Sequence, residues 1–504
     1  MADKSIVSNS KLTAIANAIR FKTGKSEKIT LDEFASEIYN ISEGNADGIK
    51  VLIDCGSVRG SSLFENSTAE NFDSILSYNT TENATSAEEM FYNCTNLKSL
   101  PNLNLSNVTT TKHMFYNCQK LETIADWTLT NKLKNTSYMF SNCYRLQSVP
   151  NIDMSNVTNA SYMFDNCEAI RYIPDLNTTQ LTNFANMFYN CKSLIAIPNI
   201  ITDSAIAFNY MFCGCNKLTE THKLNTNNVT SFSRMFEQCT SLKKAPELTK
   251  TGGNLEHMFN SCRSLEEVPL YDTNEATNMN YMFQGCSSLQ TIPEFDTTNV
   301  TSMNYTFSGC AKLNCVPNFN TSKVTTMYQM FGGCAQLTSV PDIDATSLTN
   351  TQYMFSRSGI TVAPNFYNIN KLTNTSSMFY NCTSLTTILD FDMATVTSAS
   401  SMFDYCSSLQ NVQLKNIKIA LSFTSTKVLT KESLISIFSE CVRTSSGKKI
   451  SLSTESKNLA NTLYVKFLDP SQTSIELDEK GEIVECESTD DGAMTVVEYL
   501  ALKN

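Results

Sequence analysis

Met282-Phe283-Gln284-Gly285-Cys286-Ser287-Ser288-Leu289-Gln290-Thr291-Ile292-Pro293 is the cleanest copy of a block that recurs through most of the chain. The Met-Phe pair opens fourteen copies, the first at Met90 and the last at Met402, with Thr306 replacing Met in one. The spacing is 24 residues, apart from one step of 25 and one of 23. A fixed period of this length indicates a solenoid, in which each turn buries its apolar side against its neighbours.

Apolar residues recur at the same positions of every copy. When the Met is numbered 1, these positions are 1, 2, 5, 8, 11, 14, 19 and often 22. In the copy quoted above they are Met282, Phe283, Cys286, Leu289, Ile292, Phe295, Val300 and Met303. Inward side chains at all these positions predict a continuous dry core, in which each turn depends on both of its neighbours.

The secondary structure of one copy follows from its polar and proline residues. Ser and Thr precede each Met, as in residues 299–306, so we expect a short capped helical turn at Met-Phe-x-x-Cys. The stretch Leu-x-x-Ile-Pro-x-Phe predicts a short strand, and Pro at position 12 in ten copies must limit its pairing. The predicted fold class is therefore an α/β solenoid of the leucine-rich-repeat plan, with a period of about 24 residues.

Cysteine occupies position 5 in thirteen copies, out of eighteen cysteines in all, and Ser358 replaces it in one copy. We interpret the row as buried free thiols that pack as small apolar side chains. Disulfides and a metal array are the alternatives. A metal array would need CxxC pairs or histidines, and the chain has three histidines. We expect no metal and no cofactor.

The composition limits the partners of the protein. Charged residues make up 17% of the chain and the net charge is −11, which argues against a nucleic-acid or anionic-membrane partner. No stretch is apolar for long enough to span a membrane, so we expect no membrane insertion. Residues 1–10 contain no apolar signal core, so we expect no secretory signal peptide.

Four segments are predicted. Residues 1–45 form a small helical module with helices at 11–20 and 31–39, and residues 46–89 form a linker with a strand at 49–54 and an atypical first turn that caps the core. Residues 90–412 form the solenoid. Residues 413–504 form a small α+β cap, for which we predict helices at 429–438, 456–467 and 494–502, a strand at 448–453 and a hairpin of strands 473–477 and 482–486.

We find no catalytic constellation, and we expect the protein not to be an enzyme. His113, His222 and His257 are isolated, and the first and last fall just before a Met-Phe pair, where we expect exposed side chains. Carboxylates alternate with Asn at position 15, and we interpret them as Asx caps of the next turn. A glycosidase pair of carboxylates is the alternative. The carboxylates are Asp153, Asp272, Asp296, Asp344 and Asp392.

Positions 9, 10 and 13 flank the predicted strand, face outward and vary from copy to copy. We take them as ligand-binding candidates, because a polar face with few charges suits sugar hydroxyls as well as protein surfaces. Neutral variation of exposed residues is the alternative. The candidates are Arg171, Tyr172, Glu220, Lys243, Lys244, Glu266, Glu267, Gln290, Asn318 and Asp342.

The unit Met-Phe-x-x-Cys-x-x-Leu-x-x-(Ile/Val)-Pro, with Asn-Val-Thr before the next Met-Phe, resembles the BspA-like leucine-rich repeats over residues 78–412. Such repeats are found in surface proteins of bacteria and mycoplasmas and in phage structural proteins. The resemblance implies a role in adhesion and recognition, without common catalytic residues. The departures are Thr306, Ser358 with a one-residue slip, and the absence of Pro at 125, 222 and 389.

Both ends of the chain carry a narrower resemblance. Residues 12–24 and 29–34 look like the opening of phage and prophage tail-region proteins, and residues 429–434 resemble the end cap of phage proteins with these repeats. The resemblance implies a phage tail fibre, or receptor-binding structural protein, which is made in the host cytoplasm and resides in the virion. A bacterial BspA-like surface adhesin is the alternative, and a cell-wall depolymerase is a third class for which we find no motif.

A phage tail fibre would have partners at both ends. The N-terminal helices would bind a virion tail or baseplate protein. The solenoid or the C-terminal cap would bind a host surface glycan or protein. The narrow apolar stripes of the N-terminal helices are compatible with a homotrimer.

Overall fold

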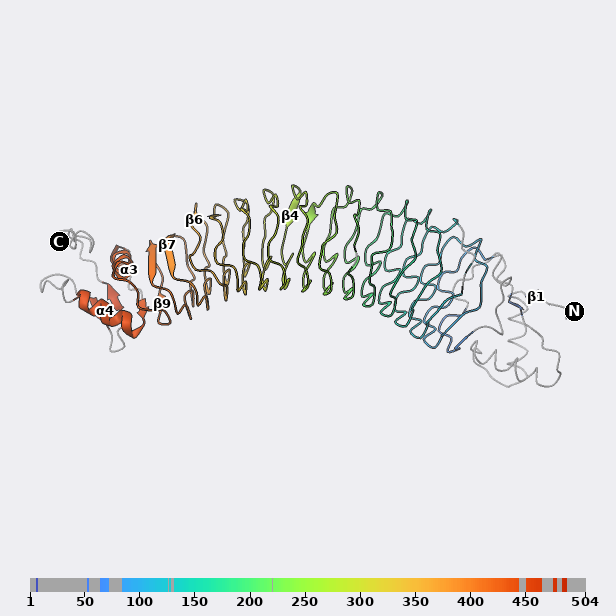
Figure 1. Ribbon diagram of the computed structural model, residues 1–504, viewed down its shortest axis with the longest axis horizontal. Coiled ribbons are helices and arrows are strands. Elements are labelled where there is room, and N and C mark those ends of the chain that lie inside the picture. The colour runs from blue at the N-terminus through green and yellow to red at the C-terminus, as the bar shows by residue number, and fades with distance from the viewer. Residues whose placement is uncertain are drawn as a thin grey trace, which may run out of the picture. The chain divides into compact units, whose positions relative to one another are not determined.

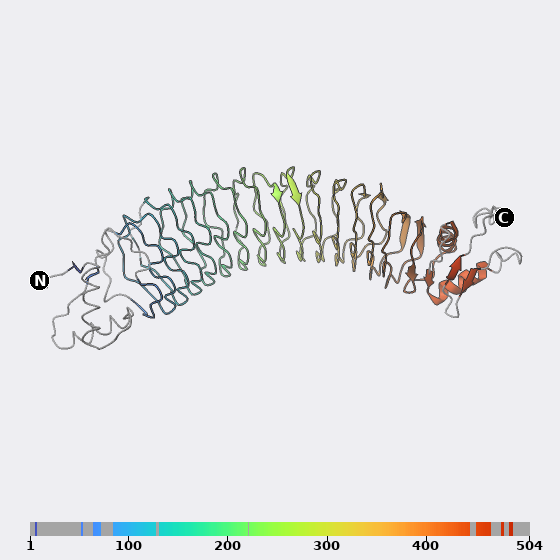
Figure 2. The ribbon, with the colours of Figure 1, turned by 180° about the vertical axis from the view of Figure 1, so that it is seen from behind.

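The computed structural model describes residues 6–7, 52–53, 64–71, 84–125, 127, 131–219, 221–443, 450–464, 475–477 and 483–486. Over the repeats the chain winds into closely stacked turns, each beside the next (Figures 1 and 2). The chain divides into two compact units. Unit 1 comprises Met1–Leu242 and Pro246–Lys250, and unit 2 comprises Lys243–Ala245 and Thr251–Asn504. Seven of the Met-Phe blocks belong to each unit.

The core of each unit is a stack of phenylalanine rings from position 2. In unit 1 the rings run from Phe64 to Phe236, with centroids 5.2–5.7 Å apart and planes within 16° of parallel. In unit 2 they run from Phe259 to Phe403, and Phe423 adds a last ring 5.0 Å away. All eight apolar side chains predicted for the copy at Met282 are buried, so the predicted inward positions are confirmed.

Backbone hydrogen bonds join one turn to the next at alternate residues of the Met-Phe block. The N–H groups of Tyr281, Phe283 and Gly285 donate to carbonyls of the next turn over 2.7–2.9 Å. Those acceptors are the carbonyls of Asn304, Thr306 and Ser308. The N–H groups in between, such as those of Met282, Gln284 and Cys286, close tight turns with carbonyls three residues earlier. Every N–H from Tyr281 to Cys286 is thereby bonded.

This alternation needs left-handed backbone at two places in each block. The residue before the Met, and the residue at position 4, have φ between 51° and 78° in all fourteen copies. Asn and Gly adopt this conformation most readily, and ten of the fourteen residues at position 4 are one or the other. The residues at position 4 are Asn93, Asn117, Asn142, Asn166, Asn190, Gly214, Gln238, Ser261, Gly285, Gly309, Gly333, Arg357, Asn381 and Tyr405.

The predicted helical turn at Met-Phe-x-x-Cys is therefore wrong. Each described block is a run of tight turns, because an α-helix cannot continue through the left-handed residue at position 4. Ser and Thr do precede each block, but they do not start a helix. The recurrent Asn or Gly before Cys was the feature of the sequence that indicated left-handed backbone at position 4.

Proline decides where the predicted strands form. The two longest strands, β7 (Thr387–Asp392) and β8 (Asn411–Lys415), pair in parallel in copies that have Leu389 and Gln413 at position 12. The other copies without Pro, at 125 and 222, lie between copies that have it, and their turns form no strand there in the described residues. A strand that runs through position 12, as β7 and β8 do, thus needs two adjacent proline-free turns, because Pro has no N–H to donate.

The remaining pairs of strands are short. In unit 2, β3 (Gly253–Asn254) pairs with β4 (Ala276–Asn278), and β5 (Ile343–Asp344) pairs with β6 (Phe366–Tyr367), both in parallel. Isolated parallel bridges join many of the other turns. In unit 1, β1 (Ile6–Val7) pairs with β2 (Leu52–Ile53), which lies within the strand predicted at 49–54.

The cysteines of position 5 are buried and free, as expected, but they do more than fill space. In both units, thiols of this row donate to the carbonyl of the Phe in the preceding turn. Cys286 Sγ lies 3.1 Å from Phe259 O, and Cys310 Sγ lies 3.1 Å from Phe283 O. Burial raises the pKa of the Cys334 thiol to about 12, so it stays protonated and able to donate at neutral pH.

The repeat starts earlier than the Met-Phe pattern indicates. Phe64 stacks on Phe91, and Asn66 has φ of 61° and accepts a hydrogen bond from Asn93 Nδ2 at 2.7 Å. Ser67 is buried at the position of the cysteine. Phe64–Ser67 is therefore a further block, which the sequence disguises because Ser replaces Cys and the spacing is longer.

Beyond the last turn, two predicted helices are confirmed as α3 (Lys431–Arg443) and α4 (Thr454–Tyr464). Thr430 Oγ1 accepts the N–H of Ser433 at 3.2 Å and so caps α3, and Ser433 Oγ in turn accepts the N–H of Val412 in β8. β9 (Leu421–Phe423) pairs in parallel with β10 (Ile450–Leu452), within the predicted strand 448–453. β11 (Ile475–Leu477) and β12 (Ile483–Cys486) form the predicted antiparallel pair.

Three predictions lie outside the described residues. They are the helices at 11–20, 31–39 and 494–502.

One glycine accommodates the irregular copy that begins at Met354. There Ser358-Gly359-Ile360 replaces Cys-x-x-Leu, so this stretch of the copy is one residue shorter. The N–H of Gly359 donates to Cys334 O at 3.0 Å, and a Cβ at Gly359 would lie 2.2 Å from Ala335 O. Only glycine fits this close approach of two backbones.

Replacing a thiol of the ladder tests its structural role. We expect Cys286→Ala to lower the free energy of unfolding by about 1–3 kcal/mol, because it removes a hydrogen bond and leaves a gap in the core. Urea unfolding of the full chain measures the change. Cys315→Ala is the control, since Cys315 is exposed. Equal stability of the two variants would contradict a structural role for the thiols.

A second substitution tests the shortened copy. We expect Gly359→Ala to destabilise the protein by about 1–3 kcal/mol, because the new methyl group overlaps a carbonyl oxygen. Gly332→Ala is the matched control, since the atoms nearest to its Cβ belong to the side chain of Gln329, which can move aside, and not to the backbone. Thermal unfolding of both variants gives the comparison, and a Gly359→Ala protein as stable as the control would show that the turn can relax.

Candidate functional site

Nine of the ten predicted ligand-binding residues are exposed in the structure, and Glu220 lies outside the described residues. The nine are spread over successive turns of both units, so they form no single site. Arg171 and Tyr172 belong to unit 1, and Tyr172 is 61% exposed.

Charged candidates of opposite sign lie beside one another in unit 2. Lys244 pairs with Glu267 across neighbouring turns, both by a parallel backbone bridge and by a 3.6 Å contact between Nζ and Oε2. The N–H groups of Glu266 and Glu267 donate to the carbonyl of Lys243. Because both side chains of the Lys244–Glu267 pair are largely exposed, the contact adds little stability.

A polar groove of about 650 Å³ crosses successive turns of unit 2, and Asn318 is the one predicted candidate that lines it. Its walls come from positions 13 to 17 of neighbouring turns. The lining residues are Glu294, Phe295, Asp296, Thr297, Thr298, Asn318, Phe319, Asn320, Thr321, Ser322, Asp344 and Tyr367. Phe295 and Phe319 are buried core residues, whereas Glu294, Asp296 and Asn318 are exposed. The volume lies in the range of known ligand sites.

The side chains at position 15 of successive turns form a row. The Asx caps predicted for these residues are confirmed. Asp296 Oδ1 accepts the N–H of Thr298 at 2.9 Å, and Asp344 Oδ1 accepts that of Thr346 at 3.0 Å. Asn320 Oδ1 accepts the N–H of Ser322 at 3.2 Å. These bonds fix the direction of each side chain and leave the second carboxylate oxygen of Asp296 outside the cap.

The caps also keep the carboxylates ionised. Hydrogen bonds from Thr298 lower the pKa of Asp296. For Asp344, partial desolvation opposes ionisation, but hydrogen bonds from Thr346 and Asn368 outweigh it and lower the pKa. The groove is therefore negatively charged at neutral pH.

Tyr367 closes the row and was not predicted. It is the register partner of Asp344 in the pair β5–β6, and its side chain is 45% exposed. This position was hard to predict, because the residue missing between Ser358 and Ile360 shifts Tyr367 by one position relative to the other turns.

The predicted exposure of His113 and His257 is wrong. His113 is half-buried beside Tyr138, with ring centroids 4.8 Å apart, and His257 stacks on Tyr281 at 4.4 Å. Aromatic residues before the Met pack along the edge of successive turns, which covers part of each ring. Burial is the main cause that lowers the pKa of His113.

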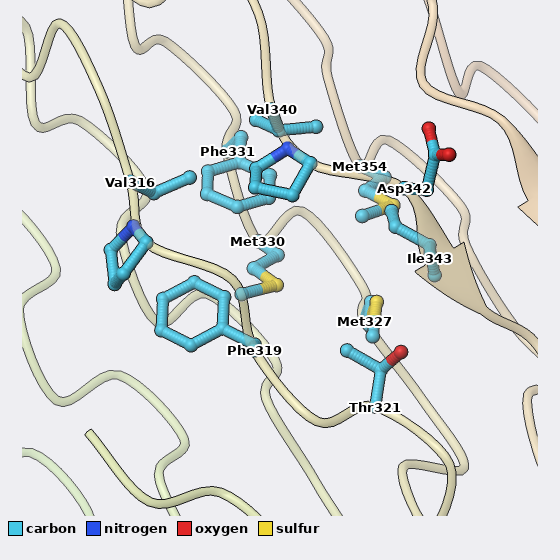
Figure 3. A pocket seen from close by; sticks show the side chains of 12 residues that line it. Val316, Phe319, Thr321, Met327, Met330, Phe331, Val340, Asp342, Ile343 and Met354 are labelled. Carbon is cyan, nitrogen blue, oxygen red and sulfur yellow. The ribbon is translucent and has the colours of Figure 1, made fainter. Parts of the chain in front are cut away.

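A second cavity, in the core of unit 2, is too small for a ligand. It has a volume of about 20 Å³, room for about one water molecule. Figure 3 shows Phe319, Phe331 and Met330 around it, whereas the carboxylate of Asp342 points away. Its walls are almost entirely apolar, so it is a packing gap between turns.

Unit 1 contains a buried carboxylate at position 3. Asp165 accepts a hydrogen bond from Ser141 Oγ at 2.9 Å, in the preceding turn. Burial raises the pKa of Asp165 to about 6, and the hydrogen bond only partly offsets this. Glu237, at the same position three turns further along, is also buried, but Arg234 pairs with it at 2.8 Å.

Among the residues that the structure describes, no three His, Cys, Asp or Glu side chains converge in a way that could hold a metal ion. None of the described helices is long and apolar enough to cross a membrane.

Comparison with protein families gives one match. The family described as "Mycoplasma protein of unknown function, DUF285" matches residues 59–173, 171–251, 253–361 and 316–417, which together make up more than half of the chain. No curated protein matches the chain.

Several solved structures resemble this one. A leucine-rich repeat protein from Bacteroides ovatus is 17% identical, with 65% of this chain and 80% of that chain covered and a TM-score of 0.39. A leucine rich cell surface protein from Faecalibacterium prausnitzii is 17% identical, with coverages of 64% and 80% and a TM-score of 0.27. A leucine-rich repeat protein from Eubacterium ventriosum is 16% identical, with coverages of 55% and 82% and a TM-score of 0.29.

The buried carboxylate predicts a pH-dependent stability. A raised pKa means that ionisation of Asp165 opposes folding, so its destabilising effect is absent below about pH 4 and complete above about pH 6. We expect Asp165→Asn to stabilise the protein by about 2–3 kcal/mol at neutral pH, and to differ little from the wild type in acid. Urea unfolding at about pH 3.5 and about pH 7.5 measures both.

Asp175→Asn is the control for this prediction, because Asp175 is an exposed carboxylate of the same turn. A stabilisation by Asp165→Asn that is the same at both pH values would show that burial of the charge is not its cause.

Proposed function

The chain belongs to the family of mycoplasma proteins of unknown function, DUF285, with BspA-like leucine-rich repeats, and from this we propose that it is a structural binding protein that recognises a cell-surface ligand. The polar groove of unit 2 carries the proposal. It presents charged, amide and hydroxyl groups on a backbone that the ladder of hydrogen bonds holds at a regular spacing. A rigid surface of this kind lowers the entropic cost of binding.

We propose non-enzymatic recognition because the groups in the groove are arranged for binding. One oxygen of each of Asp296 and Asp344 is already engaged in an Asx cap. Hydrogen bonds that lower the pKa of both carboxylates make them poor general acids at neutral pH. A glycosidase needs one carboxyl group with a raised pKa, so the groove favours a binding role.

Two biological settings fit this role. The resemblance of residues 12–24 and 29–34 to phage tail-region proteins favours a tail fibre, attached to the virion through its N-terminal segment. The family description, which names mycoplasma proteins, favours a bacterial surface adhesin of the BspA-like type. The proposed recognition of a surface glycan or protein is common to both.

Binding to cells tests the proposal. We expect fluorescently labelled full-length protein to bind the envelope of host cells saturably, and unlabelled protein to compete. In the tail-fibre setting, the protein also blocks phage adsorption, and antibodies against it label virions. In the adhesin setting, the antibodies label the surface of the producing bacterium.

Heat-unfolded protein is the control for nonspecific adhesion. Absence of saturable binding, together with release of sugars from the envelope, would replace the proposal with an enzymatic function.

A further inference from the structure

The charges that line the groove of unit 2 favour some surface ligands over others. The inference drawn from them rests on the proposed binding function. The lining of the groove contains three carboxylates, from Glu294, Asp296 and Asp344, and none of the twelve lining residues is Lys, Arg or His. Lys323, in a neighbouring position of the same turns, is held by Asn299 Oδ1 at 2.8 Å. An anionic ligand would meet only like charge here.

The groups of the groove form a row along the stack of turns. Asp296, Asn320 and Asp344 occupy position 15 of three successive turns, and Tyr367 lies beside Asp344 in the next turn. Turns that pair like parallel strands are about 4.8 Å apart, so the row extends over roughly 14 Å. A row of this length fits an extended chain molecule better than a single small ligand.

The alternation of groups along the row matches a sugar chain. Asn318 and Asn320 offer amides, Thr298 and Ser322 offer hydroxyls, and the exposed ring of Tyr367 offers an aromatic surface. Amides and hydroxyls both donate to and accept from sugar hydroxyls. The Tyr367 ring also attracts a cation placed over its face.

We propose that this groove binds an oligosaccharide with free amino groups, whose ammonium groups contact the row of carboxylates while its hydroxyls bond to the asparagines between them. A basic peptide carries the same charge. It would need apolar sites for its side-chain stems, whereas the phenylalanines of this groove are buried core residues.

Substitutions in the row can be made without breaking the fold. Asn already occupies position 15 in the neighbouring turn, where Asn320 forms the same cap. In Asp344→Asn the remaining oxygen can still accept the N–H of Thr346, so the cap is kept and only the charge is lost. Asp153→Asn is the matched control, because Asp153 caps Ser155 at 2.9 Å in unit 1 and takes no part in the groove.

Calorimetric titration of the full chain with a fully de-N-acetylated glucosamine oligosaccharide tests the proposal. At mildly acidic pH the sugar amines are protonated, while the carboxylates of Asp296 and Asp344 remain ionised. We expect saturable binding that weakens as salt is added. Asp296→Asn, Asp344→Asn and Tyr367→Ala should each weaken it about tenfold or more, and Asp153→Asn should leave it unchanged.

Three outcomes would overturn the proposal. Equal binding of the N-acetylated oligosaccharide would show that the amines are not recognised. Binding of oligolysine as tight as that of the amino sugar, with no effect of Tyr367→Ala, would show a general cation surface. No binding of the amino sugar would refute the ligand class, and cell adhesion that persists in the same preparation would show that the proposed function stands without it.

Discussion

The hydrogen bonds that pass from the Met-Phe block of one turn to the block of the next are the interaction on which the rest of the structure depends. They use every second N–H, and the N–H groups between them close tight turns within the block. This arrangement requires left-handed backbone before the Met and at position 4. It brings the phenylalanine rings to within 5.7 Å of one another in most steps of the stack, and it aims each thiol at a carbonyl of the preceding turn.

The same constraint explains where the repeat tolerates change. Ser358 can replace a cysteine, and a residue can be lost beside it, because Gly359 lets two backbones approach without a clash. Proline at position 12 is tolerated because the turns there are joined by few backbone hydrogen bonds. Where two adjacent copies lack it, β7 and β8 pair over a longer stretch. The Met-Phe edge is therefore the rigid part of each turn, and the proline edge is the part that can vary.

Variation at the proline edge of the turns creates the groove. The Asx caps at position 15 have a structural purpose, since each satisfies the N–H of the residue two positions later in the same copy. They also hold Asp296 and Asp344 in a fixed direction and keep them ionised. A row of groups that first serves the fold thus becomes a preorganised surface for a ligand, with the spacing set by the distance between turns.

The sequence by itself determined the solenoid, its period, its inward positions and the Asx caps, because these follow from residues that recur at fixed spacing. It also indicated which side chains are exposed at positions 9, 10 and 13. It did not reveal the tight turns at Met-Phe-x-x-Cys, whose left-handed residues looked like ordinary surface positions, or the additional block at Phe64. Only the tertiary structure decided that Asn318 joins Asp296, Asp344 and Tyr367 in one groove, because these residues are far apart in the chain and meet only through the register of stacked turns.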